Sequence, residues 1–170
     1  KTNAGARPGD ALVLGKPLGV GILSAALKVG DLDAQGYARM IDTVTRLNTP
    51  GAALAALPGV HAMTDVTGFG LGGHGLEMAR GDGCDVEVRW PLVPLLAGAR
   101  DLAEAGRVTG ASGRNWESYG ADIVLPDGFA HVDRALLTDP QTSGGLLIAC
   151  APEAVDQVLD IFKAQGFSGA

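Results

Sequence analysis

One acid, two threonines and four glycines lie together in residues 64–74, TDVTGFGLGGH, directly after a short apolar run at 60–63. Glycines let a backbone approach an anion closely, and amides at the start of a helix point toward it. A carboxylate such as Asp65 can hold the metal ion that accompanies a phosphate. The order of strand, acid, glycine turn and helix therefore indicates phosphate or nucleotide chemistry.

Asp65 is the strongest candidate for a functional acid in this segment. Its carboxylate is a hard oxygen ligand of the kind that Mg²⁺ takes together with phosphate oxygens. The same carboxylate could instead cap the following turn, as Asp side chains often do. Thr67, Gly68 and Gly70 could cradle a phosphate, but a strand-to-helix turn also needs glycine for steric reasons. The residue types leave both interpretations open.

Two further segments are dense in polar and turn-forming residues. Residues 137–145, LTDPQTSGG, lead directly into an apolar run and could bind a phosphate or close a cleft. They could equally form a turn whose side chains satisfy one another. Residues 107–120 show no periodicity, which predicts a long polar loop of functional type. In that loop Arg114 could reach an anion, while Trp116 and Tyr119 could anchor the loop on the body of the domain.

The histidines and cysteines suggest no further chemical site. His74 lies in the helix after the glycine turn, where a neutral imidazole could orient a neighbouring loop. His61 and His131 have no companion acid at a useful spacing. Cys84 and Cys150 lie in apolar contexts and are expected to be buried thiols of a cytosolic protein. There is no Cys/His spacing for zinc and no serine in a nucleophile-elbow pattern.

The pattern of apolar residues predicts five strands in near alternation with helices. The expected strands are 11–14, 60–63, 84–88, 123–125 and 146–150, and the expected helices are 22–30, 33–47, 52–57, 71–80, 95–106 and 152–162. Such alternation is typical of layered α/β or α+β domains. We therefore expect one domain over 1–170, with a mixed β-sheet and helices packed on its faces.

Composition excludes several classes of partner. Of the 170 residues, 46% are hydrophobic and 19% charged, which is enough apolar content for a core. The net charge is −6 and no cluster of Lys and Arg is present, so we expect no nucleic-acid partner. No apolar run approaches the roughly 20 residues of a membrane span. These features predict a cytoplasmic protein with no membrane contact.

Four segments, taken in order, resemble the selenophosphate synthetase family, also called selenide, water dikinase. They are GDALVLGKPLGVGI at 9–22, TDVTGFGLGGH at 64–74, RNWESYG at 114–120 and LLTDPQTSGGLL at 136–147. The resemblance implies the C-terminal domain of a two-domain enzyme, with the fold of the C-terminal domain of aminoimidazole ribonucleotide synthetase. The family's N-terminal domain carries the reactive Cys or selenocysteine, and its motifs are absent from these residues.

The resemblance also implies an activity and roles for particular residues. The whole enzyme, expected to be a homodimer, would use ATP, Mg²⁺, selenide and water to make selenophosphate, AMP and phosphate. Asp65 matches the aspartate that helps to hold Mg²⁺, and Thr67 and Gly68 would contact phosphate. Three further residues would line the cleft between the domains: Gln141, Thr142 and Ser143. The catalytic residues are expected upstream of Lys1 and none within this chain, which alone should be inactive.

Two positions depart from the family pattern, and two other interpretations remain. Gly72 replaces a bulkier apolar residue, which should loosen the start of the helix, and Val20 stands where a threonine is common. The chain also resembles, less closely, thiamine monophosphate kinase and hydrogenase maturation proteins of the same superfamily. It could finally be an interaction domain that has lost catalysis. Asn115, Tyr119 and the full DPQTSGG sequence favour the synthetase.

Overall fold

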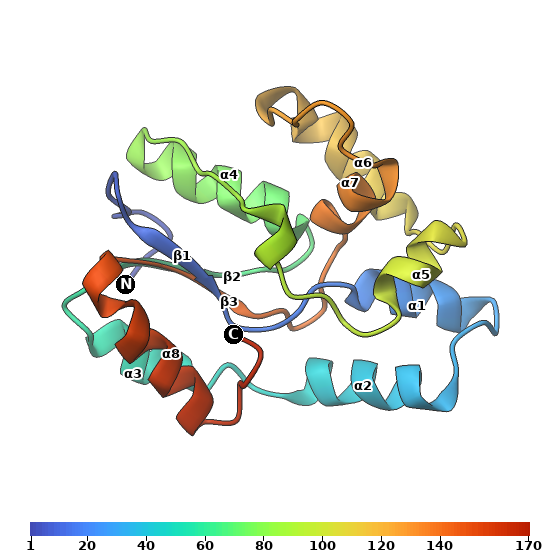
Figure 1. Cartoon of the computed structure of the whole chain (residues 1–170), viewed down its shortest axis with the longest axis horizontal. Coiled ribbons are helices and arrows are strands. Elements are labelled where there is room, and N and C mark those ends of the chain that lie inside the picture. The colour runs from blue at the N-terminus through green and yellow to red at the C-terminus, as the bar shows by residue number, and fades with distance from the viewer.

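Every residue of the chain, 1–170, is described by the computed structural model shown in Figure 1. In chain order its elements are β1 (Ala11–Leu14), α1 (Val20–Lys28), α2 (Ala34–Thr45), α3 (Pro50–Ala56), β2 (Val60–Asp65), α4 (Gly70–Asp82), η1 (Trp90–Leu92), α5 (Ala99–Glu104), α6 (Gly110–Tyr119), η2 (Gly120–Asp122), α7 (His131–Leu137), β3 (Leu146–Cys150), η3 (Pro152–Ala154) and α8 (Val155–Ala164). None of the helices combines the length and apolar character needed to cross a membrane.

The three strands form one antiparallel sheet in the order β1-β3-β2. Ile148 in the central strand β3 lies opposite Val13 of β1 and Met63 of β2. Helices cover both faces of this sheet: α4 lies on one face, and α3 and α8 lie on the other (Figure 1). All five residues of β3 are therefore buried.

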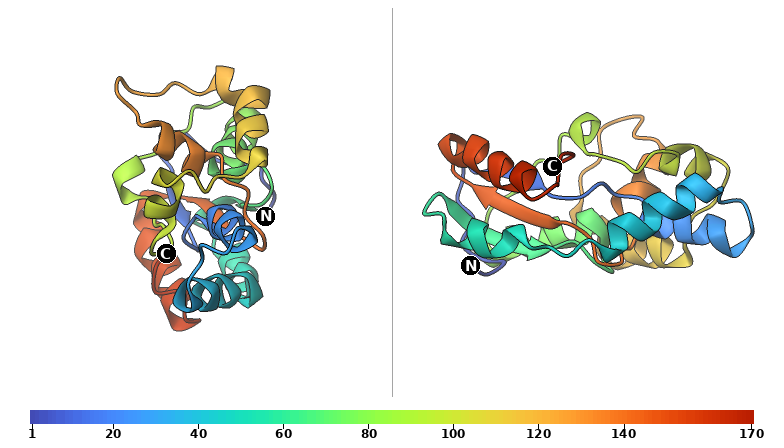
Figure 2. Two further views of the ribbon diagram at one scale, coloured as in Figure 1. Left: turned by 90° about the vertical axis from the view of Figure 1, so that its right-hand side faces the viewer. Right: turned by 90° about the horizontal axis from the view of Figure 1, so that it is seen from below.

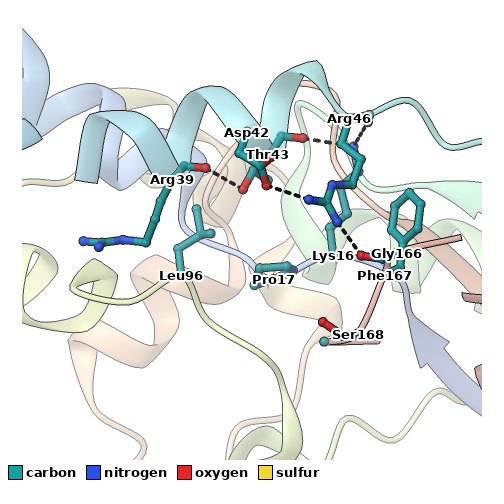
Figure 3. A pocket seen from close by; sticks show the side chains of 12 residues that line it. Lys16, Pro17, Arg39, Asp42, Thr43, Arg46, Leu96, Gly166, Phe167 and Ser168 are labelled. Carbon is teal, nitrogen blue, oxygen red and sulfur yellow. Dashed lines mark hydrogen bonds and ion pairs between the residues drawn. The ribbon is translucent and has the colours of Figure 1, made fainter. Parts of the chain in front are cut away.

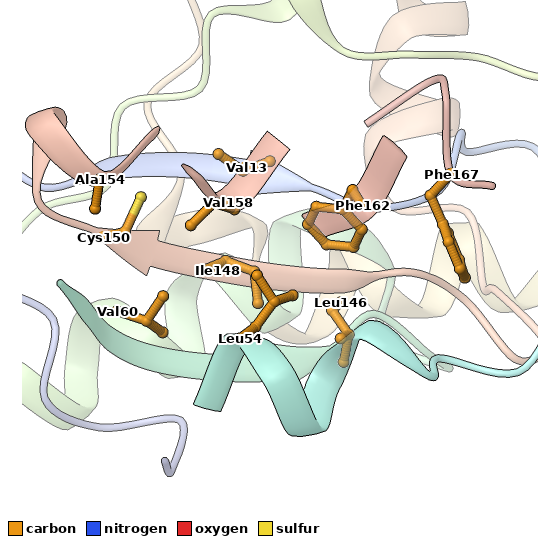
Figure 4. Close-up of a cluster of buried hydrophobic side chains, with 10 residues drawn as sticks. All are labelled: Val13, Leu54, Val60, Leu146, Ile148, Cys150, Ala154, Val158, Phe162 and Phe167. Atoms are coloured by element: carbon orange, nitrogen blue, oxygen red, sulfur yellow. The ribbon is translucent and has the colours of Figure 1, made fainter. Parts of the chain in front are cut away.

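Successive residues of β3 point to opposite faces of the sheet, so the strand contributes to two cores. Ile148 and Cys150 belong to the core beneath α3 and α8, which Figure 4 shows. Leu147 and Ala149 belong to the core beneath α4. The first core is completed by Val13, Leu54, Val60, Leu146, Ala154, Val158, Phe162 and Phe167. This double burial explains why residues 146–150 are apolar at every position.

A group of helices packs beside the sheet. Helix α1 contacts α2 and α5, and α5 contacts α7, around a third core. Its buried members are Val20, Ile22, Leu23, Met40, Leu96, Ala99, Ala103 and Leu136. Figure 2 shows that this group and the sheet with its covering helices lie next to each other along the long axis of the molecule. The end of the sheet where β2 ends and β3 begins faces this group.

The predicted fold class is confirmed, but the predicted sheet is wrong in detail. Residues 84–88 and 123–125 are irregular rather than strands, so three strands remain of the five expected. Their apolar side chains line a groove beside α4 and have no strand to pair with. The sheet is antiparallel rather than mixed, and the predicted alternation of strands and helices depended on those two missing strands. Parallel pairing is limited to an isolated bridge between Leu18 and Leu95.

The prediction of a polar loop at 107–120 is also wrong, because most of these residues form helix α6. Thr109 begins the helix, and its hydroxyl accepts a hydrogen bond from the Ser112 amide at 3.1 Å. The buried residues of α6 are Ser112, Asn115 and Tyr119, at positions i, i+3 and i+7. They share one helical face, but two of them are polar. A search for an apolar stripe therefore misses this helix.

Candidate functional site

Asp65 is the last residue of β2, opposite Leu146 of β3. Its side chain is exposed and takes part in none of the hydrogen bonds or ion pairs of the structure; the Thr64 hydroxyl donates to the backbone oxygen of Asp65 and not to its carboxylate. The interpretation that Asp65 caps the following turn is therefore wrong. The carboxylate is available for a ligand outside the chain.

The turn after Asp65 presents backbone amides. The Val66 amide donates to Gly145 and the Gly70 amide donates to Thr67, at 2.9 and 3.0 Å. The amides of Gly68, Phe69, Leu71 and Gly72 donate no hydrogen bond. Helix α4 has no side-chain cap at its N-terminus. This turn therefore offers unpaired N–H groups where the helix dipole favours an anion.

Gly70 is the residue that allows this turn to pack. Its φ of 68° lies in the left-handed region, and a Cβ there would stand 2.8 Å from the carbonyl carbon of Thr138. The backbone of residues 138 and 139 thus runs directly against the start of α4. A side chain at this position would both strain the backbone and separate the two segments.

Helix α6 holds the same turn from the other side. Asn115 Nδ2 donates to the carbonyls of Gly68 and Thr138, at 2.9 and 3.0 Å. The Tyr119 hydroxyl donates to the carbonyl of Phe69, and burial raises the pKa of Tyr119 to about 12. These contacts occupy carbonyl groups of the turn and leave its amides free. Tyr119 anchors its segment as predicted, although the segment is a helix.

The loop of residues 138–145 caps a different helix, α1. Asp139 Oδ2 accepts from the amides of Gly21 and Ile22, at 3.0 and 3.3 Å. Gln141 Oε1 accepts from the amides of Gly19 and Val20, at 3.3 and 3.2 Å. Residues about 120 positions downstream thus satisfy the orphan donors at the start of α1. The interpretation of a turn whose side chains satisfy one another holds only for the bond from Gln141 to Asp139, because both side chains also bond to the amides of α1.

The acid of this cap is unusual in its burial. Asp139 is fully buried, and its Oδ1 has no hydrogen-bond partner. Burial raises the pKa of Asp139 to about 7, although hydrogen bonds from Gln141, Ile22 and Gly21 act in the opposite direction. The Gln141 amide donates to both the carbonyl and Oδ2 of Asp139, each at 2.9 Å. Gln141 therefore supports the loop from within and does not face solvent.

Thr142 and Ser143 are exposed and lie beside the Asp65 turn. The Gln141 backbone amide donates to the Thr67 carbonyl, and the Val66 amide donates to Gly145, both at 2.9 Å. Residues 142–144 are thus held between two bonds to the turn. The structure brings Thr142 and Ser143 together with Asp65, Thr67 and Gly68 at one end of the sheet. It places Gln141 beneath them.

Lys16 is a structural residue that the sequence analysis did not single out. It is buried, and its Nζ donates to the carbonyls of Thr43, Arg46 and Ser143, at 3.2, 2.6 and 2.6 Å. Burial, and secondarily Arg46, lowers the pKa of Lys16. The contact with Ser143 ties the site loop to α2. A lysine directly after the buried strand at 11–14 was the only sequence signal for this role.

A cavity of about 290 Å³ lies beside Lys16, between α2 and the C-terminal residues. Figure 3 shows Arg46 reaching across it to the backbone of Gly166, and Asp42 pairing with Arg46 at 2.8 Å. Its basic groups are thus largely occupied by partners within the chain. The cavity lies apart from the exposed carboxylate of Asp65.

The expectation that His61 has no companion acid is wrong. His61 Nδ1 lies 2.9 Å from both carboxylate oxygens of Asp10, which precedes β1. Both residues flank Cys150 across the sheet, at the end opposite Asp65. Cys150 is buried as expected, whereas Cys84 is half-buried. No group of three His, Cys, Asp or Glu side chains that could hold a metal occurs in the chain.

Comparison with known proteins identifies the family. Residues 7–169 match the family described as AIR synthase related protein, C-terminal domain. The chain belongs to this family. It is 67% identical over all 170 residues to a protein of Burkholderia pseudomallei (strain K96243) named selenide, water dikinase. It is 54% identical over 167 residues, 98% of its length, to the protein of the same name in Rhizobium meliloti (strain 1021). The chain spans about half, 48%, of either relative.

Solved structures show the same fold. The crystal structure of E. coli HypE, a hydrogenase maturation protein, aligns with a TM-score of 0.62 and 23% identity. A crystal structure of HypE in complex with ATP aligns with a TM-score of 0.61 and 18% identity. Each alignment covers 95% of this chain and 40% of the other. The predicted fold is thus confirmed.

The catalytic residues expected upstream of Lys1 stay a prediction. Lys1 is the first residue of the chain, and its side chain is exposed. A reactive Cys or selenocysteine before Lys1 lies outside the described residues, 1–170. The half of each relative that this chain does not match is where such a residue would be sought.

Proposed function

We propose that this chain is the C-terminal domain of a selenide, water dikinase, and that it contributes half of a site for Mg²⁺ and the phosphates of ATP. The whole enzyme would make selenophosphate, AMP and phosphate from selenide, ATP and water. The 67% identity over the full chain supports this assignment. The observation that carries the site is the free carboxylate of Asp65, directly before a turn whose amides lack partners.

The ligands that this chain offers support a metal site shared between this domain and the rest of the enzyme. Mg²⁺ prefers six oxygen ligands in an octahedral arrangement and usually combines one or two carboxylates with phosphate oxygens and water. The chain offers only Asp65 at this place and no cluster of three ligating side chains anywhere. The remaining protein ligands, like the catalytic residues, would then come from the part of the enzyme upstream of Lys1. The metal would neutralise charge on the phosphates during transfer.

The surrounding residues divide into two roles. Asp65, the unpaired amides of the turn, Thr142 and Ser143 would face ATP, because they are exposed or unpaired at one end of the sheet. Asp139, Gln141 and Asn115 would hold that surface in place through their buried hydrogen bonds. Gln141, expected from the family resemblance to line the cleft, would act from beneath it.

The site is tested by replacing Asp65 with Asn in the full-length enzyme. Selenide-dependent AMP formation should fall by roughly 100-fold or more, since a ligand aimed at the transferring phosphates would be lost. The concentration of Mg²⁺ for half-maximal rate should also rise. Far-UV circular dichroism should not change, because the exposed Asp65 side chain makes no hydrogen bond or ion pair within the chain.

The matched control is Asp160→Asn, an exposed carboxylate on α8, which covers the face of the sheet away from α4. It should leave both the rate and the Mg²⁺ dependence unchanged. An Asp65→Asn enzyme with the parent rate and Mg²⁺ dependence would remove Asp65 from the site. Selenide-dependent AMP formation by the 170 residues alone would show that no second half is required.

A further inference from the structure

Ser143 is the one residue other than glycine whose backbone lies in the left-handed region, with a φ of 50°. This conformation is costly for a residue with a Cβ, and it persists only where the surrounding structure holds it. Lys16 Nζ donates to the carbonyl of Ser143 at 2.6 Å, and Asn48 Nδ2 donates to the carbonyl of Gly144 at 2.9 Å. Side chains from elsewhere in the domain therefore fix two successive carbonyls of this loop.

The tip of the loop, residues 142–144, is also tied to the segment directly after Asp65. The Val66 amide donates to the carbonyl of Gly145 at 2.9 Å. A Cβ on Gly144 would stand 1.9 Å from the carbonyl oxygen of Val66, so only glycine fits at this position. These contacts keep the tip beside the Asp65 turn.

The backbone amides of the tip have no partner. Those of Thr142, Ser143 and Gly144 donate no hydrogen bond within the chain, and the first two residues are exposed. The chain has no cis peptide bond, so the N–H of Gly144 points away from the Ser143 carbonyl and hence away from Lys16. Successive amides around a left-handed residue can form a concave site that binds anions. The tip thus has the features of an anion cradle built from backbone.

Lys16 places a positive charge behind this cradle. Its ammonium group is buried and donates to the carbonyls of Thr43, Arg46 and Ser143. It takes part in none of the ion pairs of the chain. The peptide between Ser143 and Gly144 has its oxygen on this ammonium group and its N–H on the other side. A charge at the oxygen polarises the peptide in the sense that favours an anion at the N–H.

We propose that residues 142–144 bind a phosphate group through their backbone amides, and that Lys16 is a positioning residue that holds Ser143 in the required conformation. The inference rests on the proposed function, in which this loop lies at the phosphate end of the site. It adds a second place for a phosphate group, separate from the free amides that follow Asp65. The proposed reaction needs two such places, because the two terminal phosphates of ATP leave in different products, selenophosphate and phosphate.

A contact through the side-chain hydroxyls of Thr142 and Ser143 is the alternative. A backbone cradle depends on the φ of Ser143 and not on its hydroxyl. Glycine adopts a positive φ freely, whereas a β-branched residue such as valine does so rarely. Substitutions at position 143 therefore separate the two kinds of contact.

The first test uses inorganic phosphate as the probe. In the ¹⁵N-labelled full-length enzyme, without Mg²⁺ or nucleotide, the amide signals of Thr142, Ser143 and Gly144 should shift together along one saturation curve. Tip signals that do not respond to phosphate overturn the proposal. A repeat with ATP bound identifies the source of the phosphate group. A cradle that ATP fills loses its response to free phosphate, whereas a cradle for the released product keeps it, and either result supports the proposal.

The second test compares two substitutions at one exposed position. Ser143→Val should weaken phosphate binding by about tenfold or more, because the left-handed conformation is lost. Ser143→Gly should stay within about threefold of the parent, because glycine keeps that conformation. Far-UV circular dichroism checks that both variants are folded. A loss in Ser143→Gly equal to that in Ser143→Val would assign the contact to the hydroxyl and overturn the proposal.

The third test concerns Lys16. Lys16→Met should weaken phosphate binding by about tenfold, since the charged donor to Ser143 is lost. Lys28→Met, which removes an exposed lysine of α1, is the matched control and should have no effect. Adding Ser143→Gly to Lys16→Met should restore part of the affinity, which a role of Lys16 in stability alone does not predict. A folded double variant without recovery would overturn the role of Lys16. If Lys16→Met does not fold, the pair of substitutions at position 143 still decides whether the cradle exists.

These measurements are independent of the proposed metal site, because they use phosphate without Mg²⁺. If Asp65→Asn changes the Mg²⁺ dependence and the tip does not bind phosphate, only the present inference is wrong. If the tip binds phosphate and Asp65→Asn has no effect, the cradle stands and the proposed metal site fails.

Discussion

The buried acid beneath α1 should make the stability of this chain fall as pH rises from about 4 to about 7. Asp139 is fully buried, with one oxygen bonded to the Gly21 and Ile22 amides and the other without a partner. Burial raises its pKa from 3.8 to about 7. Between these two pH values the unfolded chain has released the proton, whereas the folded chain retains it.

The sign and size of the effect follow from this difference. Where the folded state binds more protons than the unfolded state, the free energy of unfolding decreases as pH rises. A difference of about three pKa units corresponds to about 4 kcal/mol across the window, as an upper limit. That is a large share of the roughly 5–15 kcal/mol that stabilises a typical domain. Lys16 has the opposite sign in its own pH range: its pKa is lowered by burial, so stability rises as pH approaches the ordinary lysine value of 10.5.

The perturbation is Asp139→Asn, which removes the titration and keeps an oxygen to accept from the α1 amides. Urea unfolding of the 170-residue chain, followed by far-UV circular dichroism between about pH 4.5 and 8, gives the free energy of unfolding. We expect a fall of several kcal/mol in the parent and a much flatter profile in the variant. Asp33→Asn, which removes the charge of an exposed N-cap of α2 and keeps an oxygen to accept from Gly36, is the matched control. Parallel profiles for the parent and Asp139→Asn would refute the reasoning.

Three further substitutions test how the site is held. Gly70→Ala places a Cβ 2.8 Å from the backbone of Thr138 at a φ of 68°, and should lower the free energy of unfolding by about 1–3 kcal/mol; an unchanged urea midpoint would contradict this packing. Gln141→Ala leaves the buried Gly19 and Val20 amides without an acceptor and should cost about 1–3 kcal/mol per group. Amide hydrogen exchange should then quicken first at the start of α1 and not in β3. Asn115→Ala releases the Gly68 and Thr138 carbonyls. In the full-length enzyme the loss of free energy of ATP binding should exceed the loss of free energy of unfolding. A larger loss of unfolding free energy than of binding free energy would assign Asn115 to the fold alone.

The fold could be predicted where the buried residues are neighbours in the sequence. The runs at 11–14, 60–63 and 146–150 are largely apolar because helices cover the sheet, and apolar runs are what a sequence shows most clearly. The same signal misled at 84–88 and 123–125, where apolar side chains pack against α4 without a strand partner. Helix α6 was missed because its buried face consists largely of hydrogen-bonding residues.

The site was predictable only as far as its residues are neighbours in sequence. Asp65 and the glycine turn form one segment, so a joint role for them could be proposed from their spacing. The bond from Lys16 to Ser143 spans 127 positions, and the cap from Asp139 to Gly21 spans 118. The pairing of His61 with Asp10 depends on the antiparallel register around β3. Spacing along the chain carries no information about contacts of this kind.

These long-range contacts connect segments that lie far apart in the sequence, and each segment supplies hydrogen bonds that another lacks. The loop at 138–145 caps α1 through Asp139 and Gln141, and its backbone also pairs with Val66 and Thr67 beside Asp65. A change in the α1 cap would therefore move the exposed residues 142 and 143 relative to the carboxylate. Since α1 and the turn are fixed through one loop, the geometry of the proposed phosphate site depends on the buried residues Asp139 and Gln141.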